Sequence, residues 1–169
     1  MPERYILHQL NVAAKKINDH LEAREFSLAT QVAYKYFYVY LCDTYIENSK
    51  AIFDEGSEEQ KESAKQTLYT AIEGGLTMIH PFMPFLTEEL WQRLPRRQGD
   101  KTPSITVATF PQYSQEFEDE TANVEYELLV DSAKGLRSLT AEYAIKEGAS
   151  TYIQSLNDAA HTTLSSPTS

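Results

Sequence analysis

Cysteine is nearly absent from this chain, whose 169 residues contain one, Cys42. A single cysteine excludes an internal disulfide and a cysteine-cluster metal site, so we expect a reducing compartment. Long apolar runs are also missing, and residues 1–4 lack the apolar stretch of a signal peptide. The sequence therefore predicts neither a membrane span nor a signal peptide.

Glycine and proline are sparse, with 6 and 7 residues respectively, which limits turns and favours long helices. Apolar residues recur at helical spacing over much of the chain. We predict an all-α fold, an antiparallel bundle of about five to six helices. The expected helices cover residues 5–21, 26–50, 57–79, a short stretch from Thr87, 114–144 and, with a weaker pattern, 150–164.

The second expected helix is apolar or aromatic almost all round between residues 34 and 41, where the sequence is YKYFYVYL. Such a helix is usually central and touched on several sides. Its main stripe predicts that Phe37 and Leu41 face the core. In the third expected helix, Gly74 and Gly75 predict the close approach of a neighbouring backbone, for example that of the second helix.

Several helix ends carry local signals. Ser57, followed three residues later by Gln60, predicts a capping box. Pro81 and Pro84 predict a turn, after which Thr87 is expected to cap the short helix. The core-facing side chains of that helix are expected to be Leu86, Leu90, Trp91 and Leu94. The alternating stretch ITVATF at residues 105–110 predicts a short extended segment.

Signatures of catalysis are missing as well. The sequence has no glycine-rich phosphate loop and no nucleophile elbow. Cys42 lies in an apolar stripe and is expected to be buried and inert. The four histidines are scattered, without partners at metal-ligand spacing: His8, His20, His80 and His161. We therefore predict no catalytic residue, no metal site and no cofactor in this chain, which favours a binding or scaffolding module.

The net charge of −10 argues against binding to nucleic acid, for which a basic face is the usual electrostatic footprint. The distribution of charge softens this objection. Residues 1–50 carry six basic and six acidic side chains, and the excess acid follows in runs such as 54–62 and 116–127. Such runs are usually solvated helix surface. A local basic face in the first third is therefore compatible with the sequence.

Three stretches, in one unbroken order, resemble a known domain. They are LCDTYIENSK at residues 41–50, HPFMPFLTEELWQRLP at 80–95, and GLRSL at 135–139 followed by AEY at 141–143. Together they resemble the anticodon-binding domain of class I aminoacyl-tRNA synthetases. The C-D-x-Y-I-E-x-x-K pattern is similar to the valyl group of that family, and the continuation through residues 91–97 is similar to its eukaryotic cytosolic form.

The resemblance implies that the chain is part of a larger enzyme that joins valine to its tRNA with ATP and magnesium. The H-I-G-H and K-M-S-K-S type signatures of the catalytic domain are absent here. The implied partners are the anticodon stem-loop of tRNA(Val) and the catalytic domain of the same polypeptide, with no membrane and no DNA. The implied location is cytoplasmic, with a mitochondrial form left open. We expect a helical domain over residues 1–145 and a partial extension with a disordered tail over 146–169.

Unpaired anticodon bases are read by aromatic stacking, and their phosphates by cations. Helix 26–50 supplies Tyr36 and Tyr38 as alternative stacking candidates. For either one, a tyrosine packed at an interhelix edge with its hydroxyl in water is the competing interpretation. The phosphate candidates are Arg24, Lys35, Arg93, Arg96, Arg97, Lys134 and Arg137, of which Arg137 lies at a position that matches the family.

Two further residues are expected to be structural. Asp43 is a carboxylate on an otherwise apolar helix, and a buried charge must be paired, so we expect a bond to a neighbouring helix. His80 is expected to pack the turn before the short helix.

An alternative from another class is an acidic helical protein-interaction module that binds a partner helix in a groove. It fits the net charge better than RNA binding does. It does not account for the ordered match of three separate stretches. A small free-standing hydrolase, a third alternative, has no residues to support it.

Overall fold

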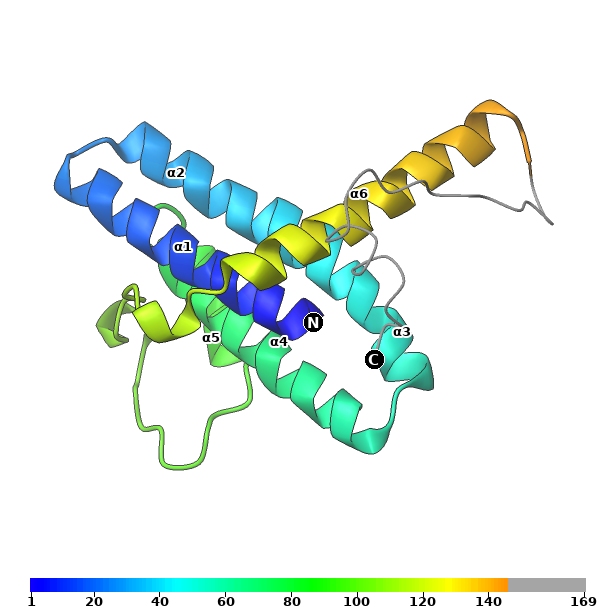
Figure 1. Ribbon diagram of the computed structural model, residues 1–169. Helices are drawn as coiled ribbons and strands as arrows, with labels where there is room; N and C mark the ends of the chain where they lie inside the picture. Colours follow the sequence, from blue (N-terminus) through cyan, green and yellow to red (C-terminus); the bar gives the residue numbers. More distant parts are fainter. Residues whose placement is uncertain (146–169) are drawn as a thin grey trace. The chain divides into compact units, whose positions relative to one another are not determined.

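The computed structural model describes residues 1–145, which divide into two compact units (Figure 1). The first unit is Pro2–Asp119, and the second begins at Glu120. Within residues 1–145 helices dominate and no strand occurs, which confirms the all-α prediction. The predicted helix at 150–164, the tail at 165–169 and His161 lie outside the described residues. The predicted domain boundary at residue 145 stays a prediction.

The core of the first unit is built from three antiparallel helical rods: α1, the run α2–η1–α3, and α4. Its elements are α1 (Pro2–Glu22), α2 (Phe26–Tyr34), η1 (Lys35–Ile46), α3 (Glu47–Glu55), α4 (Glu58–Ile79), α5 (Pro84–Gln92), and the short 3₁₀ turns η2 (Ile105–Val107) and η3 (Gln115–Phe117). The second unit contains α6 (Glu120–Glu142). Because α2, η1 and α3 follow one another without a break, they form one long helical run, as the stretch 26–50 predicted.

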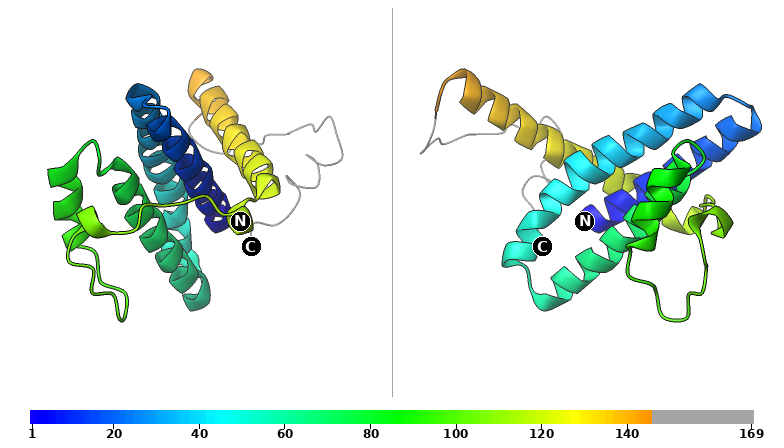
Figure 2. Two further views of the ribbon diagram at one scale, coloured as in Figure 1. Left: turned by 90° about the vertical axis from the view of Figure 1, so that its left-hand side faces the viewer. Right: turned by 180° about the vertical axis from the view of Figure 1, so that it is seen from behind.

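Three antiparallel helical rods form the core of the first unit. α1 packs on α2, on η1 and on α4, and α4 also contacts α2, η1 and α3 (Figure 2). Buried side chains from all three rods share one cluster, which includes Ile6, Ile17, Leu41, Ala71 and Met78. Burial of an Ile, Leu or Met side chain such as these stabilises a fold by about 1.5–3 kcal/mol. α5 packs on α4 beside a second cluster of Leu76, Trp91 and Ile105. Leu86 and Leu90 of α5 were predicted to face the core but are exposed, so the structure corrects that prediction.

The middle of the long helical run is a π-helix, η1, rather than an α-helix. Its hydrogen bonds join residues five apart, and the Thr44 hydroxyl repeats that spacing by donating to the Val39 carbonyl at 2.9 Å. The wider turn brings Tyr36, Leu41 and Tyr45 onto one buried face. Phe37, which the α-helical stripe placed in the core, is half-buried between the two clusters.

Gly74 and Gly75 lie where α4 meets its neighbours. A Cβ on Gly74 would come within 2.8 Å of the Leu10 side chain of α1. A Cβ on Gly75 would come within 3.1 Å of the rings of Tyr36 and Phe37 in η1. The predicted close approach is therefore present, but the approaching atoms belong to side chains and not to a backbone.

The corner between α4 and α5 differs from the predicted one. α5 begins at Pro84, whose fixed φ and missing N–H suit the first position of a helix. Thr87 is therefore inside α5 and not its cap, and its hydroxyl donates to the Met83 carbonyl at 2.8 Å. His80 packs the corner as predicted, with Nδ1 2.7 Å from the Thr87 hydroxyl and Nε2 3.2 Å from that of Thr106.

The segment after α5 also corrects two predictions. Residues 105–107 form the 3₁₀ turn η2 and not an extended segment, because the Ser104 hydroxyl accepts from the Thr106 N–H and caps the turn. The helix predicted from residue 114 begins at Glu120, since Ser114 caps the separate turn η3. The capping box of Ser57 with Gln60 at the start of α4 is confirmed.

The segment that precedes α6 is tied to α1 by buried polar groups. The Asn11 amide donates to the Ser114 carbonyl and accepts from the Ser114 N–H, both at 2.8 Å. The buried His8 accepts from the Asp119 N–H at 2.9 Å. These bonds satisfy polar groups that would otherwise be costly to bury. His8 is thus a structural residue that ties α1 to the segment before α6.

Candidate nucleic-acid interface

An exposed pair of tyrosines lies on the outer face of α2 and η1. Tyr34 and Tyr38 are 61% and 51% exposed, and their rings stack with centroids 5.4 Å apart and planes inclined by 10°. Large aromatic rings normally bury most of their area. Two parallel rings held in solvent therefore form a flat apolar platform of the kind on which an unpaired base stacks.

Lys35 follows Tyr34 directly on the same helical run. Its Nζ lies 5.2 Å from the centroid of the Tyr40 ring. Tyr40 in turn meets the buried Tyr5 of α1 edge to face, with centroids 6.2 Å apart. A cation–π contact of this kind orients the lysine without neutralising its charge. The lysine thus neighbours the tyrosine pair in sequence, with its ammonium over the Tyr40 ring.

The charge on this stretch contrasts with that of the whole chain. Between residues 26 and 42 the one charged side chain is Lys35, and no carboxylate occurs. The chain as a whole carries 25 acidic residues against 15 basic ones. The segment that bears the tyrosine pair is therefore a carboxylate-free stretch of an acidic protein, and it adds no repulsion toward a phosphate.

Tyr36 does not belong to this face, which corrects one of the two stacking predictions. It is 1% exposed, and its hydroxyl donates to the Ala71 carbonyl of α4 at 3.0 Å. Burial raises the pKa of this hydroxyl far above its ordinary value. Tyr36 lies three residues after the buried Ala33 and seven after the buried Ala29, so helical spacing itself places it on the buried face of the run.

Tyr34 is the residue that the sequence reasoning missed. The i, i+4 spacing of Tyr34 and Tyr38 places them on one face of a helix, and that spacing was visible in the sequence. The exposed platform is the pair, to which Tyr34 and Tyr38 contribute one ring each.

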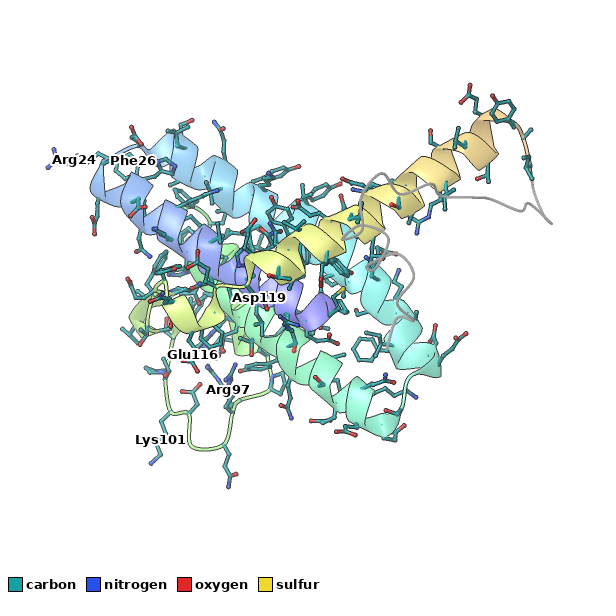
Figure 3. All side chains as sticks on the ribbon, viewed as in Figure 1. Arg24, Phe26, Arg97, Lys101, Glu116 and Asp119 are labelled. Atoms are coloured by element: carbon teal, nitrogen blue, oxygen red, sulfur yellow. The ribbon has the colours of Figure 1, made fainter. Side chains whose placement is uncertain are left out.

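Arg24 lies in the turn between α1 and α2, at the tip of the first hairpin (Figure 3). Its φ of 62° is left-handed, a conformation that glycine usually supplies at a helix end. The Glu25 N–H reaches back to the His20 carbonyl at 2.8 Å and closes the end of α1. The side chain of Arg24 is exposed, and within residues 1–145 no carboxylate lies within ion-pairing distance of it.

Three other predicted phosphate contacts are engaged within the protein. Arg93 pairs with Glu89 one turn earlier on α5. The Arg96 guanidinium lies 3.6 Å from the centroid of the Trp91 ring and 3.6 Å from a carboxylate oxygen of Asp100. Each of these pairs lowers the positive charge available to a phosphate.

Arg97 reaches from the loop after α5 to α4 (Figure 3). Its guanidinium is 3.0 Å from a Glu73 carboxylate oxygen, donates to the Thr70 hydroxyl at 3.1 Å and lies over the Tyr69 ring at 4.7 Å. This arginine therefore fastens the loop to α4, a structural role that its sequence context did not indicate.

The remaining predicted cations lie on α6, in the second unit. Lys134 is 3.9 Å from a carboxylate oxygen of Asp131, one turn away, whereas the exposed Arg137 has no carboxylate partner among the described residues. Because they belong to a separate unit, these two residues are not assigned to the face that carries the tyrosine pair.

Asp43 and Cys42 lie side by side on η1. Asp43 is exposed, so the predicted buried bond to a neighbouring helix is wrong: the π-helical turn directs this carboxylate into solvent. Cys42 is half-buried. Burial, and then the charge of Asp43, raise the pKa of its thiol above the ordinary value, which keeps it protonated and poorly nucleophilic.

The family of anticodon-binding domains of tRNA ligases matches residues 3–155 of this chain. The chain belongs to this family. It is 46% identical over 151 residues to the valine–tRNA ligase of Schizosaccharomyces pombe, a match that covers 89% of the chain and 15% of the relative. It is 42% identical over 153 residues to the mitochondrial valine–tRNA ligase of Saccharomyces cerevisiae, covering 90% and 14%. It is 37% identical over 142 residues to human valine–tRNA ligase, covering 83% and 11%.

The chain thus spans about one seventh of the length of the two fungal relatives. Over residues 1–145, no group of three or more His, Cys, Asp or Glu side chains is placed to hold a metal ion. None of the helices in that range is long and apolar enough to cross a membrane.

Proposed function

We propose that this chain is the anticodon-binding domain of a valine–tRNA ligase and that Tyr34, Lys35 and Tyr38 contact the anticodon loop of tRNA(Val). The observation that carries the proposal is the stacked, solvent-exposed tyrosine pair on a stretch without carboxylates. Membership of the anticodon-binding family and the names of the relatives supply the class of ligand.

Stacking supports the contact with bases. Anticodon bases are unpaired, so they leave their neighbours readily and stack on a protein ring. Each base–aromatic stack contributes about 1–3 kcal/mol and tolerates any base identity. The tyrosine pair therefore contributes affinity and position, and its hydroxyls are the groups available for bonds to base edges.

Cations supply the phosphate contacts. Lys35 follows Tyr34 in the sequence, and its ammonium lies over the Tyr40 ring. Arg24 marks the tip of the same hairpin, where its side chain extends into solvent (Figure 3). Arg137 on α6 remains a further phosphate candidate, as does Lys134 with its distant partner. The ion-paired Arg93, Arg96 and Arg97 are weaker candidates, because RNA would first have to displace a carboxylate.

The chemistry of the ligase belongs to another part of the polypeptide. ATP and magnesium would act in a catalytic domain that activates valine, whereas this chain contributes recognition of the tRNA. We further propose a cytoplasmic location, with a mitochondrial form in keeping with the name of the Saccharomyces relative.

The test is tRNA(Val) binding and charging by the full ligase with Tyr34→Ala, Tyr38→Ala or Lys35→Ala. Loss of one stacked ring should weaken binding by about 5- to 150-fold, which corresponds to 1–3 kcal/mol. Lys35→Ala should make the slope of log affinity against log salt concentration shallower by about 0.7, as expected for the loss of one phosphate contact on a single strand. Formation of valyl-adenylate should not change.

The matched control is Lys50→Ala. Lys50 lies on the same helical run, in α3, and is engaged by Glu47 at 2.7 Å. It should retain wild-type affinity and salt dependence. Equal losses in binding for the control and for Lys35→Ala, or a loss of adenylate formation in the tyrosine variants, would show that this face is not the RNA contact.

A further inference from the structure

A polar side chain precedes the tyrosine pair on the outer face of α2. Gln31 lies three residues before Tyr34 and seven before Tyr38, so these side chains follow one another along one face of the helical run. All three are exposed. Ser27, which is also exposed, lies one turn before Gln31 on the same face. The tyrosine pair is therefore continued toward the tip of the α1–α2 hairpin by a carboxamide and a hydroxyl (Figure 1).

The carboxamide of Gln31 is not committed to the fold. Its Nε2 lies 3.5 Å from the hydroxyl oxygen of Ser27, which is the long limit of a hydrogen bond and makes this contact a weak one. Within residues 1–145 the carboxamide has no other hydrogen-bond partner. A carboxamide carries two N–H donors and an acceptor oxygen. One donor and the acceptor oxygen of Gln31 therefore remain side by side for a ligand.

The glutamines of the neighbouring helices are engaged by contrast. Gln66 of α4 donates to the Glu62 carboxylate at 3.1 Å, and Gln92 of α5 donates to the Glu88 carboxylate at 2.7 Å. These bonds to carboxylates give both side chains structural partners on their own helices. Gln31 lies in the stretch of residues 26–42, where no carboxylate occurs. Its carboxamide thus faces a ligand without competition from an acidic neighbour.

The stacking of the two tyrosines leaves the side of Gln31 open. Residues four apart are separated by about 6 Å along a helix, so Tyr38 meets Tyr34 from the C-terminal side, with the two ring centroids 5.4 Å apart. Gln31 lies about 4.5 Å from Tyr34 along the helix on the opposite, N-terminal side. A base that stacks on the Tyr34 ring from that side therefore brings its edge to the carboxamide of Gln31.

We propose that Gln31 determines which base is accepted at the tyrosine pair and that this base is an adenine. The carboxamide oxygen accepts from the N6 amino group of the adenine, and Nε2 donates to the adjacent ring nitrogen. Adenine presents this donor beside an acceptor, and a glutamine side chain complements the two with parallel hydrogen bonds. The inference rests on the proposed function and deepens it. The rings stack on any base, whereas the carboxamide distinguishes one base from another.

The test is a double-mutant cycle between Gln31 and the N6 amino group. The full ligase, as wild type or as Gln31→Ala, is titrated with the anticodon stem-loop RNA of tRNA(Val). Each adenosine of the loop is replaced in turn by purine riboside, which lacks the amino group and retains the ring that stacks. One of these replacements should weaken binding to the wild type by about 5- to 150-fold. The same replacement should not change the affinity of Gln31→Ala, because the partner of the amino group is already gone.

Two further variants sharpen the result. Gln31→Glu retains the length of the side chain, loses the donor and adds a carboxylate to a stretch that has none, so it should bind the unmodified stem-loop more weakly than Gln31→Ala does. Gln66→Ala, an exposed glutamine of α4, is the matched control and should respond to purine riboside as the wild type does. Neither alanine variant should lower the urea midpoint, because alanine is favourable on an exposed helix surface.

The outcomes decide in either direction. The proposal is overturned if every purine riboside replacement weakens the wild type and Gln31→Ala equally, if no replacement weakens the wild type, or if Gln66→Ala abolishes the effect as well. Tyr34→Ala and Tyr38→Ala report separately on the proposed function. Weakened binding by these tyrosine variants, together with a purine riboside effect that persists in Gln31→Ala, rejects the role of Gln31 and leaves the anticodon contact in place.

Discussion

Because Tyr36 is buried, its substitution should change the stability of the domain and leave its affinity for tRNA unchanged. Tyr36→Phe removes the hydroxyl and leaves the ring, so no cavity forms. The lost bond is the one to the Ala71 carbonyl, which as an interior carbonyl of α4 retains its helical N–H partner. The cost is thus near the middle of the range for a neutral buried hydrogen bond, about 1 kcal/mol.

The hydroxyl is protonated over the whole accessible pH range, since burial raises its pKa, so this cost should not depend on pH. Tyr36→Ala would add a cavity and raise the cost to about 3–5 kcal/mol. A sharp difference between the two variants is the signature of a ring that packs and a hydroxyl that bonds.

The assay is urea unfolding followed by tryptophan fluorescence. Trp91 is the single tryptophan of the chain and is buried in the second cluster, so it reports on the first unit. Tyr36→Phe should move the midpoint to lower urea without a change in slope. Its affinity for tRNA(Val) should equal that of the wild type. A variant of unchanged stability that binds tRNA at least about fivefold more weakly would refute the reasoning, because a 1–3 kcal/mol loss of binding is what a stacking ring produces.

Two further predictions concern the α1–α2 turn and the α5–η2 contact. The free energy of unfolding of Arg24→Gly should exceed that of Arg24→Ala by about 1 kcal/mol, because alanine retains the strain of the left-handed φ and glycine does not. Both variants lose the cation, so both should weaken tRNA binding to the same extent. Glu88→Gln should affect stability at neutral pH and not in acid. Hydrogen bonds from Gln92, Ser104 and Ile105 lower the pKa of Glu88 below its ordinary value of 4.5. The contribution of the Glu88 carboxylate to the free energy of unfolding is therefore fully present above pH 4.5 and is lost as the pH falls through the lowered pKa. The urea midpoints of variant and wild type should therefore converge at a pH below the lowered pKa. A difference that stays constant with pH would contradict the role of the ionised carboxylate.

Helical periodicity was sufficient for the elements with a single buried stripe. α1 and α4 lie close to the predicted ranges, and the capping box at Ser57 marks the start of α4. In both helices local propensity and tertiary packing favour the same residues. The sequence pattern alone therefore predicted the bundle and its antiparallel pairing.

Periodicity failed where two arrangements of the backbone compete. In η1 almost every side chain is apolar, so the pattern did not decide which ones are buried. The i→i+5 hydrogen bonds changed the spacing after Tyr36, so that Leu41 is buried and Asp43 is exposed. Around α5, proline was interpreted as a helix breaker, although at Pro84 it occupies the first turn that it tolerates. These choices depend on long-range contacts, such as Tyr36 with Ala71, that a single sequence does not display.

The cations show the same limit. Arg93, Arg96 and Arg97 form a basic run in sequence, which predicted phosphate contacts. In the fold each meets a carboxylate or a ring supplied by α4, α5 or the following loop. Charge patterning identifies where positive residues are, but their availability to RNA depends on what the fold places beside them.

The acidic character of the chain and its proposed RNA contact are compatible because charge is segregated along the long helical run. Its first 17 positions, residues 26–42, carry one lysine and no carboxylate, whereas the acidic run 54–62 begins where α3 ends. Screening at physiological ionic strength limits the reach of an exposed carboxylate to roughly 8 Å, so carboxylates farther than that from the tyrosine pair contribute little there. Local composition, set by which turn of the helix faces solvent, therefore governs binding more than the total of −10 does.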